Sequence, residues 1–276
     1  GEYSMPGSIS HAKIVAFGSI PRFLDLSQVR GHTVSDSRDT IFSDPALEPA
    51  PFAFDDSVAR VFPDMIRRSV PGYSTIIAMT GLLAGRYATS GSNLYDLGCS
   101  LGASTLAMRQ NLQQPDCRIV AVDSSPAMLE GCRTIVDTDT HDTPVSLVCA
   151  RLEDVAIEDA SVVVLNFTLQ FVPVAERDAV IQRIYDGLRP GGILVLSEKV
   201  TFSDPHLDAL NIDLHHQFKR ANGYSDLEIA RKRDALENVL LRETLERHRR
   251  RLTAAGFSSC DVWFQCFNFA SLVALK

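Results

Sequence analysis

The sequence lacks a long hydrophobic run, and its cysteines form no CxxC pair. No apolar stretch approaches the roughly 20 residues that a helix needs to cross a bilayer, and the first residues do not have the layout of a signal peptide. The six cysteines show no metal-like spacing with histidine. We therefore expect a cytoplasmic protein with reduced thiols, no membrane contact and no bound metal.

The chain also has fewer positively charged than negatively charged residues. The chain has 27 Lys and Arg against 34 Asp and Glu, which gives a formal net charge of −7 and a pI near 5.5. An acidic chain has no general attraction to nucleic acid, so no stable nucleic-acid binding is expected and a small-molecule partner is favoured. A hydrophobic content of 45% and a mean hydropathy of +0.02 are typical of a globular protein.

The length of 276 residues favours one domain with appendages over two domains. Residues 1–35 have no clear period and many Gly, Ser and Pro, and "GEYSMPGS" could be a remnant of cloning. We treat residues 1–35 as an N-terminal extension and residues 36–276 as a single domain. Between residues 36 and 92 the pattern predicts a loop followed by helices, with Val58, Val61, Met65 and Ile66 at helical spacing.

Predicted strands and helices then alternate. Strands are expected at 93–97, 118–122, 145–150, 161–166 and 193–197, with helices at 102–113, 125–136 and 175–188. Such alternation indicates a parallel sheet with helices on both faces. Residues 203–255 are predicted to form a helical insertion, and "CDVWFQCFNFASLVALK" an antiparallel strand pair. The expected fold is therefore α/β, with a mostly parallel seven-stranded sheet.

One strand-to-helix turn has the features of a ligand site. The segment "NLYDLGCSLGASTLA" carries Gly98 and Gly102 in a turn of a kind that presents backbone N–H groups to a ligand. The spacing differs from GxGxxG, and the carboxylate of Asp96 would repel a pyrophosphate but suits an ammonium group or the loop amides. Asp123 ends the next strand, where a carboxylate can hold two ribose hydroxyls. These features favour S-adenosylmethionine (SAM) over NAD, and a tight turn without a ligand is the other interpretation.

Other polar residues have ordinary explanations when each is taken alone. Asn166 ends an apolar strand at the edge where open α/β sheets bind ligands, but a satisfied buried amide is an equal alternative. Tyr73 suits a core or an interface, and Arg233 suits the solvated face of a charged helix. His215 and His216 are adjacent and should point to different sides of a helix, so they are not expected to share a metal. The residues alone therefore predict a SAM-binding α/β protein.

Several segments together carry a closer resemblance. They are "FDDSVARVFPDMIRRSVPGYSTII", "YDLGCSLGASTLAMR", "VAVDSSPAM", "IEDASVVVLNFTLQF", "LVLSEK", "HHQFKRANGYSDLEIARKR" and "DVWFQCFNFASLVALK". The chain resembles the carboxy-S-adenosyl-L-methionine (carboxy-SAM) synthase family of bacteria, with "LNFTLQF" and "FKRANGYS" as the most specific motifs. The resemblance implies a Rossmann-like class I methyltransferase fold, a homodimer, and conversion of SAM and prephenate to carboxy-SAM and phenylpyruvate. It also implies a partner, tRNA 5-hydroxyuridine carboxymethyltransferase, which uses the product to modify the wobble uridine of tRNA.

The resemblance further implies a set of ligand contacts. They are Tyr73, Gly98, Cys99, Ser100, Asp123, Ser124, Asn166 and Arg233. Arg233 would partner the extra carboxylate of carboxy-SAM, because a planar guanidinium matches a carboxylate. One departure concerns adenine, since Arg151-Leu152 stands where the family has an acidic and then an apolar residue. Arginine cannot accept from the adenine amino group, so the backbone of Leu152 or the side chain of Glu153 would replace the acid.

No Ser/His/Asp or Cys/His arrangement can be assembled from the spacing, and the implied mechanism explains why. Prephenate loses carbon dioxide and hydroxide as it becomes aromatic, the hydroxide takes a methyl proton from SAM, and the carbanion captures the carbon dioxide. This route needs positioning, exclusion of water and a cation, without a metal. The alternatives are an ordinary SAM-dependent methyltransferase of small molecules and a non-catalytic carboxy-SAM carrier.

Overall fold

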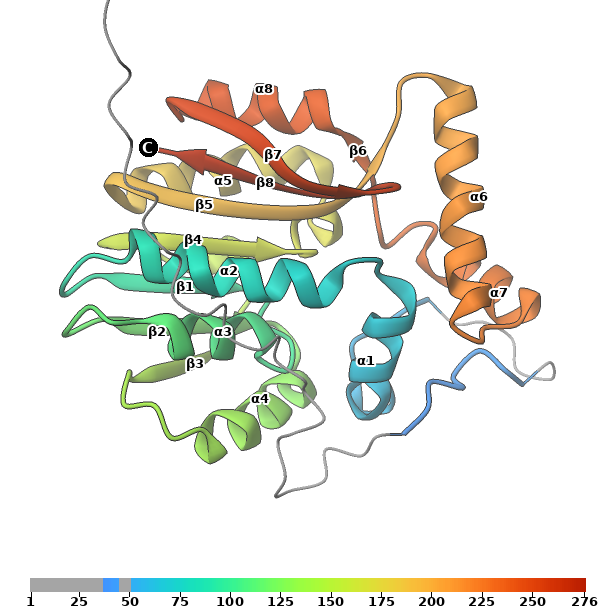
Figure 1. The fold of residues 1–276 in the computed structure, drawn as a ribbon, viewed down its shortest axis with the longest axis horizontal. Helices are drawn as coiled ribbons and strands as arrows, with labels where there is room; N and C mark the ends of the chain where they lie inside the picture. Colours follow the sequence, from blue (N-terminus) through green and yellow to red (C-terminus); the bar gives the residue numbers. More distant parts are fainter. Residues whose placement is uncertain (1–36, 45–50) are drawn as a thin grey trace, which may run out of the picture. The chain divides into compact units, whose positions relative to one another are not determined.

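The apolar runs of the sequence form the central strands of a sheet in the computed structural model, which describes residues 37–44 and 51–276. The predicted extension, residues 1–35, lies outside the described residues. The strands follow the order β3-β2-β1-β4-β5-β8-β7 (Figure 1). Their bounds are β1 Asn93–Leu97, β2 Arg118–Asp123, β3 Val145–Cys149, β4 Ala160–Asn166, β5 Leu188–Thr201, β7 Ser259–Cys266 and β8 Phe269–Leu275. β1 to β5 are parallel, whereas β8 is antiparallel to β5 and β7, so the predicted topology is confirmed.

Two details of the sheet differ from the sequence prediction. β5 begins at Leu188, within the segment expected to end the preceding helix, because Leu188 pairs with Ala160 of β4. A two-residue strand, β6 (Glu243–Thr244), pairs in parallel with the end of β5, inside the segment 203–255 that was expected to be a helical insertion. Two residues carry no periodic pattern, so the sequence could not indicate this strand.

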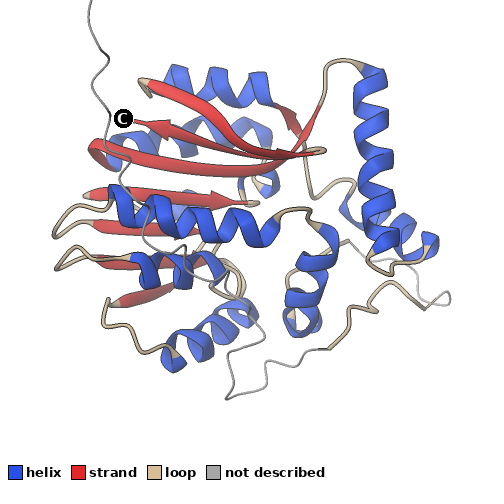
Figure 2. Ribbon diagram, in the orientation of Figure 1, coloured by secondary structure: helices blue, strands red, loops and turns tan. Residues whose placement is uncertain are grey.

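Helices cover both faces of the sheet (Figure 2). Their bounds are α1 Asp56–Ser69, α2 Tyr73–Tyr87, α3 Ala103–Asn111, α4 Pro126–Thr138, α5 Arg177–Gly187, α6 Pro205–Ala221, α7 Asp226–Leu236 and α8 Leu245–Ala255. Successive residues of a strand point to opposite faces, so Ile193 packs in the cluster that includes α2 and α3, and Leu194 in the cluster that includes α5 and α8. Both faces of β5 are thereby buried, as its unbroken apolar run predicts.

Three helices, α1, α6 and α7, gather beyond the carboxyl ends of the parallel strands (Figure 1). α1 buries Val58, Val61 and Met65, three of the four residues that the sequence placed on its apolar stripe. α7 begins with a capping box, in which Ser225 Oγ accepts from the Glu228 amide and Glu228 accepts from the Ser225 amide. No helix in the described residues is long and apolar enough to cross a membrane.

Polar contacts hold α6 against α1. Arg68 Nε donates to the Asn222 carbonyl at 2.7 Å, and its Nη1 pairs with Asp64 of the same helix at 2.9 Å. From α6, the Nε2–H of His215 donates to the Ser69 carbonyl at 2.8 Å. These long-range contacts fix a helical wall opposite the edge of the sheet where parallel α/β proteins bind their ligands.

Candidate active site

A cavity of about 1000 Å³ lies between the carboxyl edge of the sheet and the wall of α1, α6 and α7. The turn after β1, the ends of β2 and β4, and the last residues of β5, at Lys199, contribute to its lining. The residues that the sequence marked as ligand contacts all line it: Tyr73, Gly98, Cys99, Ser100, Asp123, Ser124, Arg151, Leu152, Asn166 and Arg233. The fold therefore brings these residues to one cavity, and their contact with SAM stays a prediction.

The Asp123 carboxylate is oriented by backbone amides. Its Oδ2 accepts from the Ser100 amide at 2.8 Å and its Oδ1 from the Ser125 amide at 2.9 Å. Burial raises the pKa of Asp123, and the amide hydrogen bonds partly oppose that rise. A carboxylate oxygen accepts more than one hydrogen bond, so Asp123 can still accept from two hydroxyl groups of a ligand in the cavity.

The amides of the glycine turn are used within the protein, contrary to the sequence expectation. The amides of Gly98 and Cys99 both donate to the Val122 carbonyl, at 2.8 and 2.9 Å, and the Ser100 amide donates to Asp123. A turn whose amides are already paired is a poor cradle for phosphate, which needs free N–H groups. The geometry therefore disfavours a dinucleotide for a reason that the sequence did not show.

Gly98 is required by both conformation and space. Its φ of 81° lies in the left-handed region that favours glycine. A Cβ at this position would lie 2.2 Å from Thr168 Oγ1, in the segment after β4. The turn after β1 is thus packed directly against the end of β4, and the two form one continuous wall of the cavity.

Of the two roles that the sequence offered for Asp96, the structure favours hydrogen bonds within the protein over contact with an ammonium group. It is 1% exposed, does not line the cavity, and accepts from Thr105 Oγ1 at 2.6 Å. Burial is the main cause that raises its pKa to about 6. Asp96 therefore ties the end of β1 to the first turn of α3 rather than meeting an ammonium group of a ligand.

Asn166 is the satisfied amide that the sequence offered as its alternative interpretation. Its Oδ1 accepts from Ser197 Oγ at 2.6 Å, and its Nδ2 donates to Ser104 Oγ at 2.9 Å. These bonds connect β4 to β5 and α3. They also fix the direction in which the amide faces the cavity, so a structural role and a ligand contact are compatible here.

The other predicted contacts differ in how firmly they are held. Tyr73, the first residue of α2, places its ring 6.3 Å from that of Phe167, and burial raises the pKa of its hydroxyl. Arg151 is 59% exposed and pairs with Glu153 at 3.1 Å and Glu176 at 3.3 Å. Arg233 is 64% exposed and pairs with Asp234 at 2.9 Å, as expected on a charged helix, although it also lines the cavity.

Sequence reasoning missed a group of basic residues on the cavity wall. Lys199 of β5, Lys219 of α6 and Lys232 of α7 line it, together with His215 and His216. The two histidines were expected on different sides of a helix, but both line the cavity, with ring centroids 6.2 Å apart. The available signal was the scarcity of lysine: the sequence has five, and three of them fall between residues 199 and 232.

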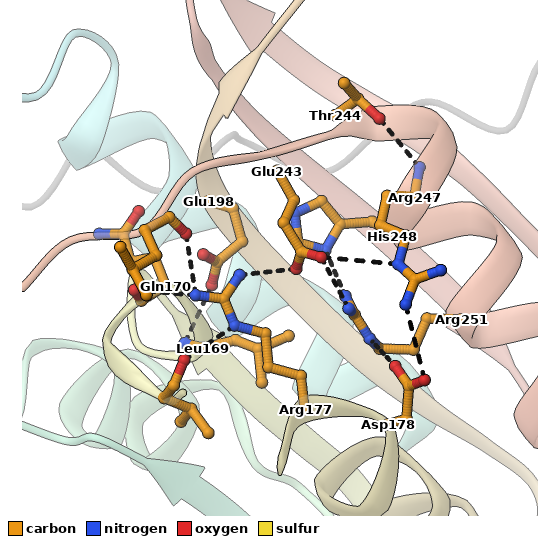
Figure 3. A network of polar contacts seen from close by, with 12 residues as sticks. Leu169, Gln170, Arg177, Asp178, Glu198, Glu243, Thr244, Arg247, His248 and Arg251 are labelled. Atoms are coloured by element: carbon orange, nitrogen blue, oxygen red, sulfur yellow. Dashed lines mark hydrogen bonds and ion pairs between the residues drawn. The ribbon is translucent and has the colours of Figure 1, made fainter. Parts of the chain in front are cut away.

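A buried ion-pair network holds the segment that closes one side of the cavity (Figure 3). Arg177 is fully buried and donates to the carbonyls of Gln170 and Leu241, at 3.1 and 2.8 Å. Its Nη1 pairs with Glu243 at 2.6 Å, and Arg251 pairs with the other oxygen of that carboxylate at 2.9 Å. Because Gln170 and the neighbours of Leu241 line the cavity, this network positions the cavity wall.

Comparisons with known proteins agree with this geometry. Residues 94–192 match the family model described as a methyltransferase domain. A carboxy-S-adenosyl-L-methionine synthase of Citrifermentans bemidjiense is 60% identical over 239 residues, which are 86% of this chain and 98% of that protein. Another from Trichlorobacter lovleyi is 61% identical over the same shares. A solved structure of human N-acetylserotonin methyltransferase in complex with SAM shares the fold, with a TM-score of 0.54 at 15% identity, covering 80% of this chain and 55% of that chain. The chain therefore belongs to the carboxy-S-adenosyl-L-methionine synthases, which are transferases, and it has their class I methyltransferase fold.

Proposed function

We propose that this protein converts SAM and prephenate into carboxy-SAM and phenylpyruvate. The observation that carries the proposal is one cavity with two chemically different sides. The sheet edge carries Asp123 and Asn166, with Lys199 next along β5, and the facing helices α6 and α7 carry Lys219 and Lys232. Its volume of about 1000 Å³ is at the upper end for small-molecule sites, which suits two ligands bound together.

In this proposal SAM lies along the edge of the sheet. Asp123 accepts from the two ribose hydroxyls, while Gly98, Cys99, Ser100 and Ser124 pack around the ligand. Because Glu153 already accepts from Arg151 at 3.1 Å, the backbone of Leu152 is the simpler partner for adenine. Tyr73 and Asn166 then face the methionine part of SAM.

The reaction balances between the two substrates alone, and no side chain of the protein is oxidised, reduced or covalently modified. Prephenate releases carbon dioxide and hydroxide and becomes phenylpyruvate. The hydroxide takes one proton from the methyl group on the sulfonium of SAM to form water, and the carbon that lost the proton forms a bond to carbon dioxide. The protein holds the two substrates together, excludes water and provides cations for the carboxylates.

The first prediction is that purified protein turns SAM and prephenate into carboxy-SAM and phenylpyruvate in the presence of a chelator. Mass spectrometry of the nucleoside product and absorbance of phenylpyruvate measure the two products, which should form in equal amounts. A matched reaction with phenylpyruvate in place of prephenate should give no carboxy-SAM, because no carbon dioxide is released.

Other outcomes of this experiment would contradict the proposal. Transfer of a methyl group to a small molecule, without carboxy-SAM, would make the protein an ordinary methyltransferase. Carboxy-SAM that co-purifies with a protein unable to turn over prephenate would make it a carrier. A requirement for added zinc or magnesium after chelation would overturn the metal-free route.

We propose that the protein acts in the bacterial cytoplasm as a homodimer that supplies carboxy-SAM to tRNA 5-hydroxyuridine carboxymethyltransferase. The resemblance to the family supports both the homodimer and the partner enzyme. The exposure of Arg233 gives the dimer a physical reason, since a guanidinium that is 64% exposed binds a carboxylate weakly unless a second surface covers it. A second copy of the chain would be that surface.

The second prediction concerns Arg233→Leu, which should weaken binding of carboxy-SAM far more than binding of SAM. Only carboxy-SAM has the extra carboxylate, and a charged pair that is covered loses about 3–5 kcal/mol when one partner is removed, against about 1 or less when exposed. Calorimetry with each ligand measures the difference, and Arg233→Lys should recover part of it, since it keeps the charge without the planar fork. Equal weakening toward both ligands would show that Arg233 does not recognise the carboxylate.

A further inference from the structure

Two lysines on the cavity wall make no close ion pair with a carboxylate among the described residues. Lys219 is 5% exposed, and its ammonium makes neither a hydrogen bond nor an ion pair there. It lies 5.4 Å from the ring of Tyr224, and the more distant charges of Asp39 and Glu228 oppose only part of the effect of burial on its pKa. Lys199 is half-buried, and its ammonium faces the ring of Phe269 at 5.7 Å. Within the described part of the chain it makes no ion pair, and Asp208 acts on it only from a distance. A buried charge without a partner costs stability, so a fold retains it most readily where a ligand supplies the missing charge.

The other cations of the wall are already paired within the protein. Lys232 donates to Ser69 Oγ at 3.1 Å and lies 3.7 Å from Asp39. Arg242 lies 3.5 Å from Asp208. Lys199 and Lys219 therefore differ from these side chains, because their ammonium groups make no hydrogen bond or ion pair with residues 37–44 and 51–276, although all of them line the same cavity.

The cavity carries a surplus of positive charge in an acidic protein. Its cationic lining residues are Lys199, Lys219, Lys232, Arg151, Arg233 and Arg242, and its anionic ones are Asp123, Glu153, Asp234 and Glu237. The chain as a whole has a formal charge of −7. A local excess of two cations suits a ligand that carries two negative charges.

The position of Lys199 connects this surplus to the SAM side of the cavity. Ser197 and Lys199 are two residues apart on β5 and so point to the same face of the sheet. Ser197 Oγ donates to Asn166 Oδ1 at 2.6 Å, which places Lys199 next along β5 from the contact of Asn166. On the opposite wall, His216 and Lys219 of α6 line the same cavity as Lys199, and burial and then the charges of these two lysines lower the pKa of His216.

We propose that Lys199 and Lys219 bind the carboxylates of the second substrate, a dicarboxylate, and hold it against the SAM side of the cavity. This inference rests on the proposed function, because it assigns residues to prephenate. Prephenate has two carboxylates, and lysine presents a compact charge with three donors, which suits a carboxylate. Burial lowers the pKa of Lys199 to about 7 and that of Lys219 to about 8, and a bound carboxylate would favour their charged forms.

The test uses the full chain and the variants Lys199→Met and Lys219→Met. Calorimetry measures prephenate binding to protein loaded with S-adenosyl-L-homocysteine, which lacks the methyl group and so prevents turnover. Each variant should bind prephenate about 10- to 100-fold more weakly, as expected for a lost charged hydrogen bond, while the dissociation constant of SAM changes less than about two-fold. Lys276→Met is the matched control, because Lys276 bonds the carbonyl of Tyr185 outside the cavity.

Further measurements separate a binding role from a structural or catalytic one. Removing an unpartnered buried charge should leave the melting temperature unchanged or raise it, whereas a structural lysine would lower it. KM for prephenate should rise more than kcat falls, and Lys199→Arg should restore part of the affinity. A lower kcat with unchanged prephenate affinity would make Lys199 a participant in the chemistry and overturn the inference.

The failure of this inference can be told from the failure of the proposed function. Unchanged prephenate affinity in both variants, with normal turnover by the wild type, overturns the lysine assignment and leaves the reaction in place. A wild-type protein that neither binds nor converts prephenate overturns both.

Discussion

Arg177→Met should lower the free energy of unfolding by about 3–5 kcal/mol, because it breaks a buried ion pair on one side. Arg177 is fully buried, and it pairs with Glu243 at 2.6 Å. It also donates to the carbonyls of Val172, Gln170 and Leu241. Methionine fills a similar volume, so the loss would come from the carbonyls and the carboxylate that remain buried without a donor.

Thermal or urea unfolding measures this loss, and Arg250→Met is the control. Arg250 is also an arginine paired with a glutamate, Glu246, but its side chain is 69% exposed. An exposed pair one helical turn apart contributes about 0.3–0.5 kcal/mol, so this variant should unfold almost as the wild type does. A loss below about 1 kcal/mol for Arg177→Met would show that the network shown in Figure 3 does not hold the fold.

The same network gives the stability a dependence on pH. Burial alone would raise the pKa of Glu243, but hydrogen bonds from Arg251 and Arg177 lower it to about 2, from an ordinary value of 4.5. A carboxyl whose pKa is lower in the folded state contributes stability that is present above its unfolded pKa and is lost as the pH falls towards the folded value. In Arg177→Met this loss between about pH 4.5 and 2 should be smaller, since one of the two charged partners is absent.

The sequence predicted the layers of the fold because local pattern determines them. Apolar runs such as Val162–Leu165 mark strands buried on both faces, and the Ser125-Pro126 start marks α4. The sequence could not predict the Arg177 network, since Arg177 and Glu243 lie 66 residues apart and neither belongs to a periodic pattern. Local spacing carries no information about which side chains meet across such a distance.

The predicted site shows a similar division. The sequence and the resemblance marked Asp123, Asn166 and Arg233 as site residues, and the structure places all three on one cavity. They did not indicate that the amides of the glycine turn are paired within the protein. They also missed Lys199 and Lys219, which stand in the quoted segments "LVLSEK" and "FKRANGYS" but belong to different elements, so that their spacing in the sequence did not indicate a common cavity. What a turn exposes, and which charges lack partners, are properties of the packed structure.

Asp123→Ala should weaken SAM binding by about 2–3 kcal/mol, roughly 30- to 150-fold in the dissociation constant. In the proposed pose its carboxylate accepts from both ribose hydroxyls. Its removal costs those charge-assisted bonds and leaves the hydroxyls poorly paired in the cavity. Calorimetry with SAM measures the loss, and Asp137→Ala on the exposed side of α4, outside the cavity, is the control that should bind normally.

A SAM analogue without the two ribose hydroxyls separates this contact from an effect on the turn. Asp123 also accepts from the Ser100 and Ser125 amides, so its loss could loosen the turn after β1 as well as remove a ligand contact. If the ribose contact accounts for the loss, wild-type protein should bind the analogue about as weakly as Asp123→Ala binds SAM. The variant should then bind SAM and the analogue nearly equally, because the two changes remove the same interaction. A variant that still prefers SAM over the analogue by the full wild-type factor would show that other residues hold the ribose, and Asp123 would remain only as the support of the turn.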